Sequence, residues 1–231
     1  FRDLVKANGL KFKYKIQSRV DLLLKEDTIT ALAQSGAETV WVGAESGSQK
    51  ILDAMDKGTT IEEINTATKL LKKNNIRVAF FLQFGYPGET KEDINKTVEM
   101  VLNLMPDEIG ISVSYPLPGT KFFENVKDQL KTKSNWADSD ELALMFRNTF
   151  PPAYYKRLHR YVHKVYRKRV GLKSILNIVR NPLSVSAKNL RSAILILYYI
   201  PASILDSFLL KKLETAEWLL SRSYIKVILV E

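Results

Sequence analysis

The first half of the chain alternates apolar runs with amphipathic segments. Residues 12–17 alternate Phe, Tyr and Ile with Lys and Gln, which is the period of a β-strand. Further apolar runs span residues 39–44, 77–84 and 109–115. Gln83 is the only break in the run over residues 77–84. Such continuous runs are typical of strands buried on both faces of a parallel sheet.

The segments between these runs have the signals of helices. Thr60 and Glu63 form a capping-box pattern, and Thr90 can cap a second helix. A short helix is expected over residues 28–34, closed by Gly36, and another begins near Ser48. The four runs start about 27 to 38 residues apart, which predicts right-handed, parallel βα units.

Four βα units do not close a barrel, so the fold class is α/β with a partial (β/α) barrel or part of an open sheet. The first residue is Phe1 rather than Met, and we expect the chain to be a piece of a longer protein whose missing strands precede it. Three parts are predicted: residues 1–130 as barrel, 131–170 as a helical extension and 171–231 as a basic, apolar helical tail. Helices are expected over residues 136–147 and 152–169.

Charge separates the C-terminal third from the rest. The 231 residues have a formal net charge of +10, and residues 151–231 contain 15 Lys and Arg against 4 Asp and Glu. The first 150 residues contain the other 20 Lys and Arg and the other 21 Asp and Glu, so their formal net charge is −1. The tail is therefore suited to an anionic partner, either a membrane or a nucleic acid.

The most apolar stretch, residues 193–210, is interrupted by Pro201 and charged by Asp206. It is open to three interpretations: interfacial membrane contact, packing on the barrel or a partner, or a spanning helix. The chain has no Cys, which excludes disulfides and thiolate metal sites within these residues. His159 and His163 are spaced for a metal, but the Lys and Arg around them favour a solvated basic face.

Polar residues at the strand ends are the candidates for chemistry, because ligands of parallel α/β proteins bind at the carboxyl ends of strands. Glu45 ends the second strand, where a capping or solvated carboxylate is the alternative. Arg19 ends the first strand and is either a surface ion-pair partner or a ligand for an anion. Pro-Gly turns follow the third and fourth strands at residues 85–90 and 116–120.

In this order, SRVD, VGAESGSQKILDAMDKGTT, FGYPGET and SYPLPGT resemble the radical S-adenosylmethionine (SAM) superfamily. The resemblance is to its cobalamin-binding branch of anaerobic magnesium-protoporphyrin monomethyl ester cyclases, and it spans residues 14–169. It implies part of a (β/α)6 barrel that binds SAM and a four-iron four-sulfur cluster, with cobalamin in an upstream domain. The family holds its cluster with a CxxxCxxC loop, which this chain lacks, so the cluster ligands are expected upstream of Phe1.

Carried over by position, the resemblance assigns Glu45 to the ribose hydroxyls, with Ser46 in the adjoining turn. Lys57 matches the position that faces the methionine carboxylate, and Arg19 shares that anion or orders Glu45. Gln83 is assigned to ligand or substrate. Ser112 and Tyr115 bound the segment that flanks the adenine.

The resemblance implies that the full-length protein is an enzyme that forms a 5′-deoxyadenosyl radical, or methylates or oxidatively modifies a hydrophobic or lipid-like substrate with help from a reductant protein. A transfer RNA methylthiotransferase is the first alternative, although its basic appendage would be a β-barrel rather than helices. A degenerate barrel acting as a membrane-associated scaffold is the second. Nucleic acid is not favoured, and the expected location is the cytoplasm, with the tail at the inner face of the membrane.

Overall fold

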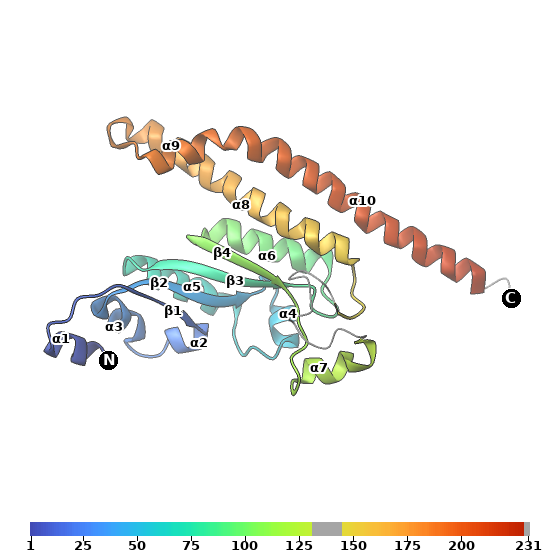
Figure 1. Ribbon diagram of the computed structural model, residues 1–231, viewed down its shortest axis with the longest axis horizontal. Coiled ribbons are helices and arrows are strands. Elements are labelled where there is room, and N and C mark those ends of the chain that lie inside the picture. Colours follow the sequence, from blue (N-terminus) through green and yellow to red (C-terminus); the bar gives the residue numbers. More distant parts are fainter. Residues whose placement is uncertain (131–144, 229–231) are drawn as a thin grey trace. The chain divides into compact units, whose positions relative to one another are not determined.

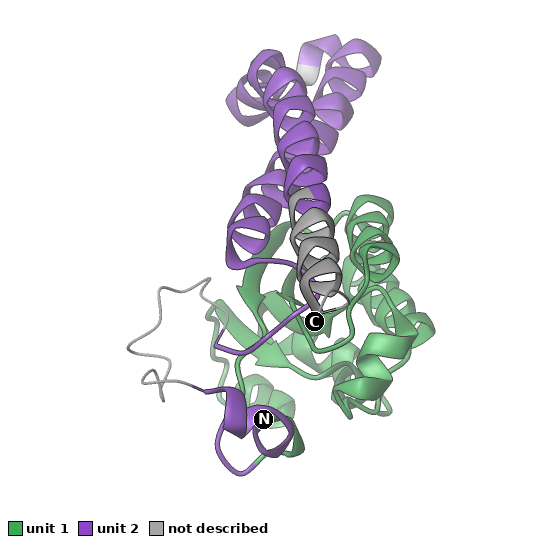
Figure 2. Cartoon of the chain, turned by 90° about the vertical axis from the view of Figure 1, so that its right-hand side faces the viewer, with its two compact units in different colours: residues 1–116, 120–122 green, residues 117–119, 123–231 purple. Residues whose placement is uncertain are grey.

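A computed structural model describes residues 1–130 and 145–228, with backbone only for Ser184 and residues 216–228. The chain divides into two compact units (Figure 2). Unit 1 comprises residues 1–116 and 120–122, and unit 2 comprises residues 117–119 and 123–231.

Unit 1 is a four-stranded sheet with its connecting helices (Figure 1). The strands are β1 (Tyr14–Ser18), β2 (Ala37–Glu45), β3 (Arg77–Phe84) and β4 (Glu108–Val113). The helices are α1 (Arg2–Ala7), α2 (Val20–Leu23), α3 (Thr28–Ser35), α4 (Gln49–Ala54), α5 (Ile61–Lys73) and α6 (Lys91–Leu104), and α7 (Lys121–Val126) crosses the unit boundary.

The strands lie in the order β1-β2-β3-β4, and every neighbouring pair is parallel. The predicted parallel βα units are therefore confirmed. Because right-handed crossovers that always move to the next strand place their helices on one face, this order is typical of a barrel wall. A doubly wound sheet would reverse its strand order at some point.

The helix-covered face of the sheet holds the core. Val40, Val42, Phe80 and Leu82 are at most 1% exposed, and they alternate with partly exposed residues along β2 and β3. The amphipathic helices α5 and α6 bury Ile64, Leu71, Ile94 and other apolar side chains. This burial of one face removes apolar area from water and fixes the strand register.

The opposite face, which we call the inner face, is partly exposed. Trp41 of β2 stacks on Phe81 of β3, with ring centroids 4.6 Å apart and planes at 28°. Gly110 of β4 lies beside them, and a Cβ there would come within 3.1 Å of the Trp41 ring. The inner face thus has an aromatic platform next to a position that only a glycine fills without displacing it.

Local end signals account for several element boundaries. Thr60 and Thr90 each form a capping box, with Glu63 and Asp93 respectively, and Gly36 ends α3 in the left-handed region at φ 100°. These caps confirm the predicted helix starts and the Gly36 stop. The prediction did not include α2 and α7, whose four and six residues are too short for a periodic apolar pattern.

Unit 2 is mainly a helical hairpin. Helix α8 (Pro152–Arg180) is followed by η3 (Pro182–Ser184), α9 (Ala187–Ile194) and α10 (Ile196–Ile228), while η1 (Lys127–Gln129) follows α7. The boundary predicted at residue 170 falls inside α8, so the expected extension and tail share one continuous helix. The helix predicted for residues 136–147 lies mostly outside the described residues.

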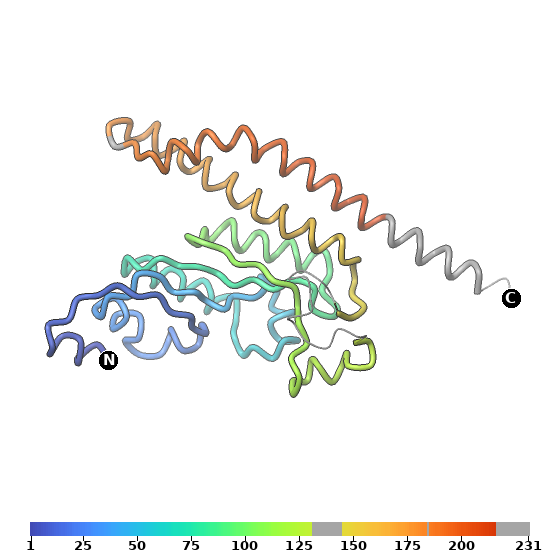
Figure 3. Tube along the Cα trace, viewed as in Figure 1, coloured from blue at the N-terminus to red at the C-terminus, as the bar shows by residue number. Residues whose placement is uncertain are grey.

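Helices α8, α9 and α10 pack closely on one another (Figure 3). A Cβ on Gly171 would lie 2.6 Å from the Ser192 carbonyl oxygen and 2.5 Å from the Ile196 side chain. Gly171 therefore permits a close approach of α8 to the α9–α10 junction. Asp206 of α10 is fully buried and forms ion pairs with Arg157 at 2.9 Å and Lys164 at 2.7 Å.

Candidate functional site

Glu45 occupies an irregular position at the carboxyl end of β2. The pairing of β2 with β3 shifts register between Gly43 and Glu45, and Glu45 adopts a left-handed conformation with φ 54°. Side chains other than Asn and Asp rarely adopt this conformation, so it marks a constrained position. Glu45 Oε1 lies 3.1 Å from the point that a Gly43 Cβ would occupy, so the carboxylate folds back over Gly43.

Lys57 reaches this carboxylate from the segment that follows α4. Its Nζ donates a hydrogen bond to Glu45 Oε1 at 3.0 Å, and the Glu45 side chain is 16% exposed against 40% for Lys57. Arg19 binds Asp21 with two hydrogen bonds, and its Nη2 lies 3.4 Å from the Lys57 carbonyl oxygen. The structure thus brings Arg19, Glu45 and Lys57 together, with Lys57 rather than Arg19 in contact with Glu45.

The turn after Glu45 is hydrogen-bonded to α6. Thr97 Oγ1 accepts a hydrogen bond from the Gly47 amide at 2.9 Å and lies 3.1 Å from Ser46 Oγ, while Ser48 Oγ donates to Asp93 at 2.6 Å. A Cβ on Gly47 would lie 2.3 Å from the Lys96 carbonyl oxygen. Ser46 is fully buried with its hydroxyl at Thr97, so its side chain anchors the turn, and its contact with a cofactor stays a prediction.

Asp93 acts as the centre of this anchor. Burial raises the pKa of Asp93, but hydrogen bonds from Ser48 and Thr90 and the charge of Lys50 lower it well below its usual range overall. Lys50 Nζ also donates to the Gly88 carbonyl oxygen at 3.0 Å. An ionised Asp93 therefore joins the loops after β2 and β3 to the start of α6.

The loop after β3 also contacts α4 and the start of α7. Tyr86 donates from its hydroxyl to the Ala54 carbonyl oxygen at 2.7 Å, and its ring packs against Phe122. Lys121 forms an exposed ion pair with Asp56 at 3.0 Å. The loops that follow three strands thus converge on α4, as expected for carboxyl ends in parallel register.

The other predicted site residues lie on β3 and β4. Gln83 is half-buried and pairs in register with Ser112, whose hydroxyl is exposed and 3.5 Å from the Leu82 carbonyl oxygen. Gln83 lies two residues beyond Phe81, and Ser112 lies two residues beyond Gly110. Because every second residue of a strand faces the same side, both lie on the inner face with the aromatic platform. Tyr115 is half-buried just beyond β4.

One buried acid at this end of the sheet, Glu89, was not among the predicted site residues. Glu89 is fully buried: one carboxyl oxygen accepts from the Gly85 amide at 2.6 Å, and the other has no hydrogen-bond partner in the described part of the chain. Burial raises the pKa of Glu89 to about 8, and Asp93 adds to the increase. Ser114 Oγ is likewise buried without a partner among the described residues. Sequence alone does not distinguish Glu89 from a solvated turn carboxylate.

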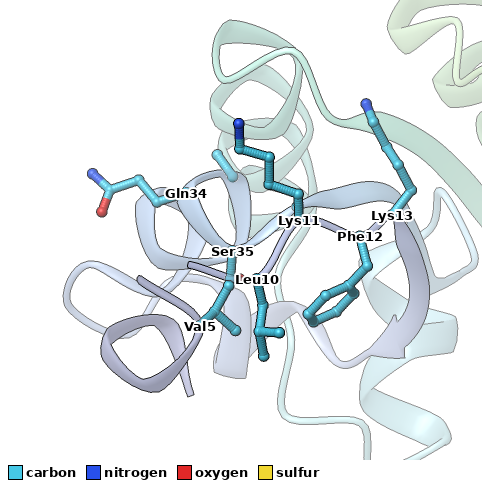
Figure 4. A pocket seen from close by; sticks show the side chains of 9 residues that line it. Val5, Leu10, Lys11, Phe12, Lys13, Gln34 and Ser35 are labelled. Carbon is cyan, nitrogen blue, oxygen red and sulfur yellow. The ribbon is translucent and has the colours of Figure 1, made fainter. Parts of the chain in front are cut away.

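A pocket of about 330 Å³ lies at the opposite, amino end of the sheet (Figure 4). Val5, Leu10 and Phe12 line it together with Lys11 and Lys13. The hydroxyl of Ser35 at its wall already binds Tyr14 and the Ala31 carbonyl oxygen. Its remaining polar side chains are Lys11, Lys13 and Gln34, and Gln34 already accepts a hydrogen bond from Lys6. Since long, flexible side chains do not form a fixed and convergent set of polar groups, the carboxyl end is the stronger candidate site.

Within residues 1–130 and 145–215, no group of three or more metal-ligating side chains is close enough to hold a metal ion. His159 and His163 meet edge to face, with ring centroids 4.7 Å apart. Burial lowers the pKa of His163 to about 4, with further lowering from His159 and Arg167. With no Cys in its sequence, the chain offers no thiolate for an iron–sulfur cluster.

Part of the chain is similar to a known enzyme family. Residues 3–101 match the model of the radical SAM superfamily. An uncharacterized methyltransferase of Pyrococcus horikoshii is 30% identical over 57% of this chain and 29% of its own length. The anaerobic magnesium-protoporphyrin IX monomethyl ester cyclase of Cereibacter sphaeroides is 30% identical over 54% of this chain and 21% of its own length.

Other relatives include a tRNA-2-methylthio-N(6)-dimethylallyladenosine synthase of a Sulfurihydrogenibium species, which is 37% identical over 42% of this chain and 23% of its own length. The matched segments thus span less than a third of these relatives. A solved structure of the cobalamin-dependent SAM radical enzyme OxsB is similar in fold, with a TM-score of 0.51, 16% identity, and coverage of 91% of this chain and 36% of that one. The chain is therefore similar to the radical SAM superfamily over residues 3–101, and its relatives include the anaerobic cyclases.

Proposed function

We propose that the carboxyl end of the sheet is the SAM site of a radical enzyme. The observation that carries this proposal is Glu45, held in a left-handed conformation at a strand end and paired with Lys57. A fixed carboxylate accepts hydrogen bonds from two vicinal ribose hydroxyls at once. The ammonium of Lys57 has two further donors, and these suit the methionine carboxylate.

The residues around this pair have supporting roles. Gly43 leaves space on the inner face for the Glu45 carboxylate. Arg19 lies against the Lys57 backbone, so it positions Lys57 and adds positive charge for the same carboxylate. Gln83 and Ser112 present polar groups side by side, and with Tyr115 they flank the adenine.

The superfamily uses SAM and a four-iron four-sulfur cluster, and the bound cluster supplies the electron for reductive cleavage of SAM. The absence of Cys means that residues of this chain do not hold it. We therefore assign to this chain the binding and orientation of SAM, and to the remainder of the full-length protein the cluster. Cobalamin, present in the OxsB structure, is a further cofactor proposed for that remainder.

The aromatic residues of the inner face favour an apolar substrate. The stacked rings of Trp41 and Phe81 lie on the same face as Gln83 and next to Gly110. Stacked aromatic rings bind planar or apolar groups with little loss of side-chain freedom. We propose methylation or oxidative modification of a hydrophobic molecule as the reaction of the full-length enzyme.

Equilibrium dialysis with radiolabelled SAM tests the site on the chain itself. Wild type is expected to bind, and Glu45→Gln is expected to bind about ten to a hundred times more weakly, the value of one or two charge-assisted hydrogen bonds. Glu108→Gln is the matched control, because Glu108 is a half-exposed carboxylate paired with Arg77 at 2.7 Å. Equal affinity in all three proteins would contradict the assignment.

A transfer RNA methylthiotransferase activity is the second candidate, favoured by the 37% identical synthase. The helical hairpin of unit 2 argues against it, because sequence-tolerant RNA binding is more typical of small β-barrels with exposed aromatic residues. Gel-shift titration of the chain with unmodified transfer RNA separates the two candidates. If transfer RNA binds in a salt-sensitive way and the Lys173→Glu and Arg180→Glu variants bind it as tightly as wild type, the RNA site lies outside the hairpin.

A further inference from the structure

The end of the helical hairpin in unit 2 has an unusually apolar exposed surface. Its exposed members include Val179 of α8, Leu183 of η3, and Leu197, Ile204, Leu205 and Phe208 of α10. We call these six residues the hairpin patch. Leu183 is fully exposed and Leu197 is 80% exposed. Exposed apolar side chains gathered on one part of a protein mark a contact site for a partner or a membrane.

The spacing of the α10 members aligns them along one side of the helix. Leu197, Ile204 and Phe208 recur at intervals of seven and four residues, the period of one helical face. The face turned toward α8 carries the buried Ile196, Ser203 and Leu210 instead. The patch is thus the outer face of α10, continued over the turn to the end of α8.

The single acid inside the apolar stretch does not reach this surface. Asp206 is fully buried and pairs with Arg157 and Lys164 of α8. Its charge is therefore balanced within the hairpin, and the outer face between residues 193 and 210 has no charged side chain. The charge that made residues 193–210 a poor membrane segment in sequence is an internal ion pair in the structure.

Exposed cations lie on the helices of the hairpin and next to the patch in sequence. Lys173 and Arg180 of α8 and Lys188 and Arg191 of α9 are all exposed, and Lys211 and Lys212 follow Phe208. Between residues 171 and 215 the only acids are Asp206 and Glu214. Lys212 Nζ lies 4.7 Å from the centroid of the Phe208 ring, which places a charge directly at the edge of the apolar surface.

We propose that the hairpin patch docks into the headgroup layer of an anionic lipid bilayer, without crossing it. Apolar side chains at the centre with Lys and Arg at the edge match the acyl boundary and the anionic headgroups respectively. Tyr198 is half-exposed beside Leu197 and suits the same layer. The inference is independent of the proposed function.

The helix geometry agrees with a surface position. Among the described helices, none taken alone is long and apolar enough to cross a bilayer. Ala187–Ile194 and Ile196–Thr215, which meet at a 42° bend, pass that length and composition test only as a pair. The close contact of Gly171 with Ser192 and Ile196 holds this bend, so the patch is presented on a fixed scaffold.

Fluorescence of a single label tests the docking directly. Because the chain has no Cys, a Leu197→Cys variant takes one nitrobenzoxadiazole group, and Leu4→Cys in unit 1 is the matched control, since Leu4 is also exposed. With phosphatidylcholine vesicles that contain phosphatidylglycerol, the label at residue 197 is expected to shift to the blue and brighten, and the label at residue 4 is not. No shift, or equal shifts at both positions, would overturn the proposal.

Co-sedimentation with the same vesicles separates the apolar and electrostatic contributions. Ile204→Glu with Phe208→Glu is expected to weaken binding at least about tenfold, and Lys188→Glu with Arg191→Glu to weaken it mainly at low salt. Helix content by circular dichroism checks that both variants fold, and the charge variant leaves the patch intact. If neither variant weakens binding, or if the patch variant instead abolishes self-association without vesicles, the lipid assignment is wrong.

Discussion

The two ends of the parallel sheet each carry a carboxylate paired with a cation, but only one end has the surroundings of a site. At the amino end, Glu108 and Arg77 lie 2.7 Å apart, and each is at least 40% exposed. At the carboxyl end, Glu45 and Lys57 are slightly farther apart at 3.0 Å, yet the carboxylate is only 16% exposed. Solvation weakens an exposed pair regardless of its length.

The backbone makes the second difference. Glu108 begins a regular strand, whereas Glu45 follows a register shift in a left-handed conformation, and the turn after it is bonded to Thr97 and Asp93. Strained positions persist only where the surrounding structure fixes them. The anchoring of its carboxylate, rather than the length of its ion pair, therefore distinguishes the candidate site.

The largest expected effect is the loss of that anchor. Gly47→Ala would place a Cβ 2.3 Å from the Lys96 carbonyl oxygen, so α6 or the turn must move. We expect the free energy of unfolding to fall by about 3 kcal/mol, measured by urea denaturation, since backbone gives way less readily than a side chain. Gly88→Ala is the control for glycine replacement in a neighbouring turn: its φ of 79° gives strain, but no atom lies within 4 Å of the added Cβ. A smaller loss for Gly47→Ala than for Gly88→Ala would contradict the anchor.

Replacing the cation of each ion pair is expected to change SAM affinity only at the carboxyl end. Lys57→Met should reduce SAM affinity about tenfold, because it removes a charge-assisted hydrogen bond at the site. Arg77→Met at the amino end should leave the affinity unchanged. Calorimetric titration of both variants checks this, and a matching loss in Arg77→Met would show that the effect is not local to the carboxyl end.

Glu89 is expected to make the stability of the chain depend on pH. The pKa of Glu89 is about 8 in the folded chain, against an ordinary value of 4.5, so between these values the folded state holds a proton that the unfolded state has lost. Glu89 therefore makes stability fall as pH rises from about 4.5 to about 8. The melting temperature of wild type relative to Glu89→Gln should drop by several degrees between pH 5 and pH 9. For the exposed Glu62→Gln, the difference from wild type should stay constant, and a constant difference for Glu89→Gln would refute the buried-acid account.

Much of the fold was predictable because its signals are local. The four strands follow from apolar runs, and the starts of α5 and α6 follow from threonines that bond to residues three positions later. The site was predictable only in part. Glu45 and Lys57 are twelve residues apart on one strand–helix unit, and the resemblance assigned both.

The remaining features depend on contacts that are distant in sequence. Ser46 meets Thr97 across 51 positions, so its role as an anchor has no local pattern. Asp206 pairs with Arg157 across 49 positions, which turns an apparent break in an apolar stretch into a buried ion pair. Glu89 stands in a turn, where sequence favours exposure, and its burial depends on the packing of the whole sheet end.

Hydrogen–deuterium exchange of the chain with and without SAM reports on both ends of the sheet in one measurement. The account predicts slower exchange on addition of SAM in residues 43–48, 57–59 and 83–86, with no change in residues 10–14, 34–37 and 106–109. Protection at the amino end, or none at the carboxyl end under conditions where SAM is bound, would contradict it.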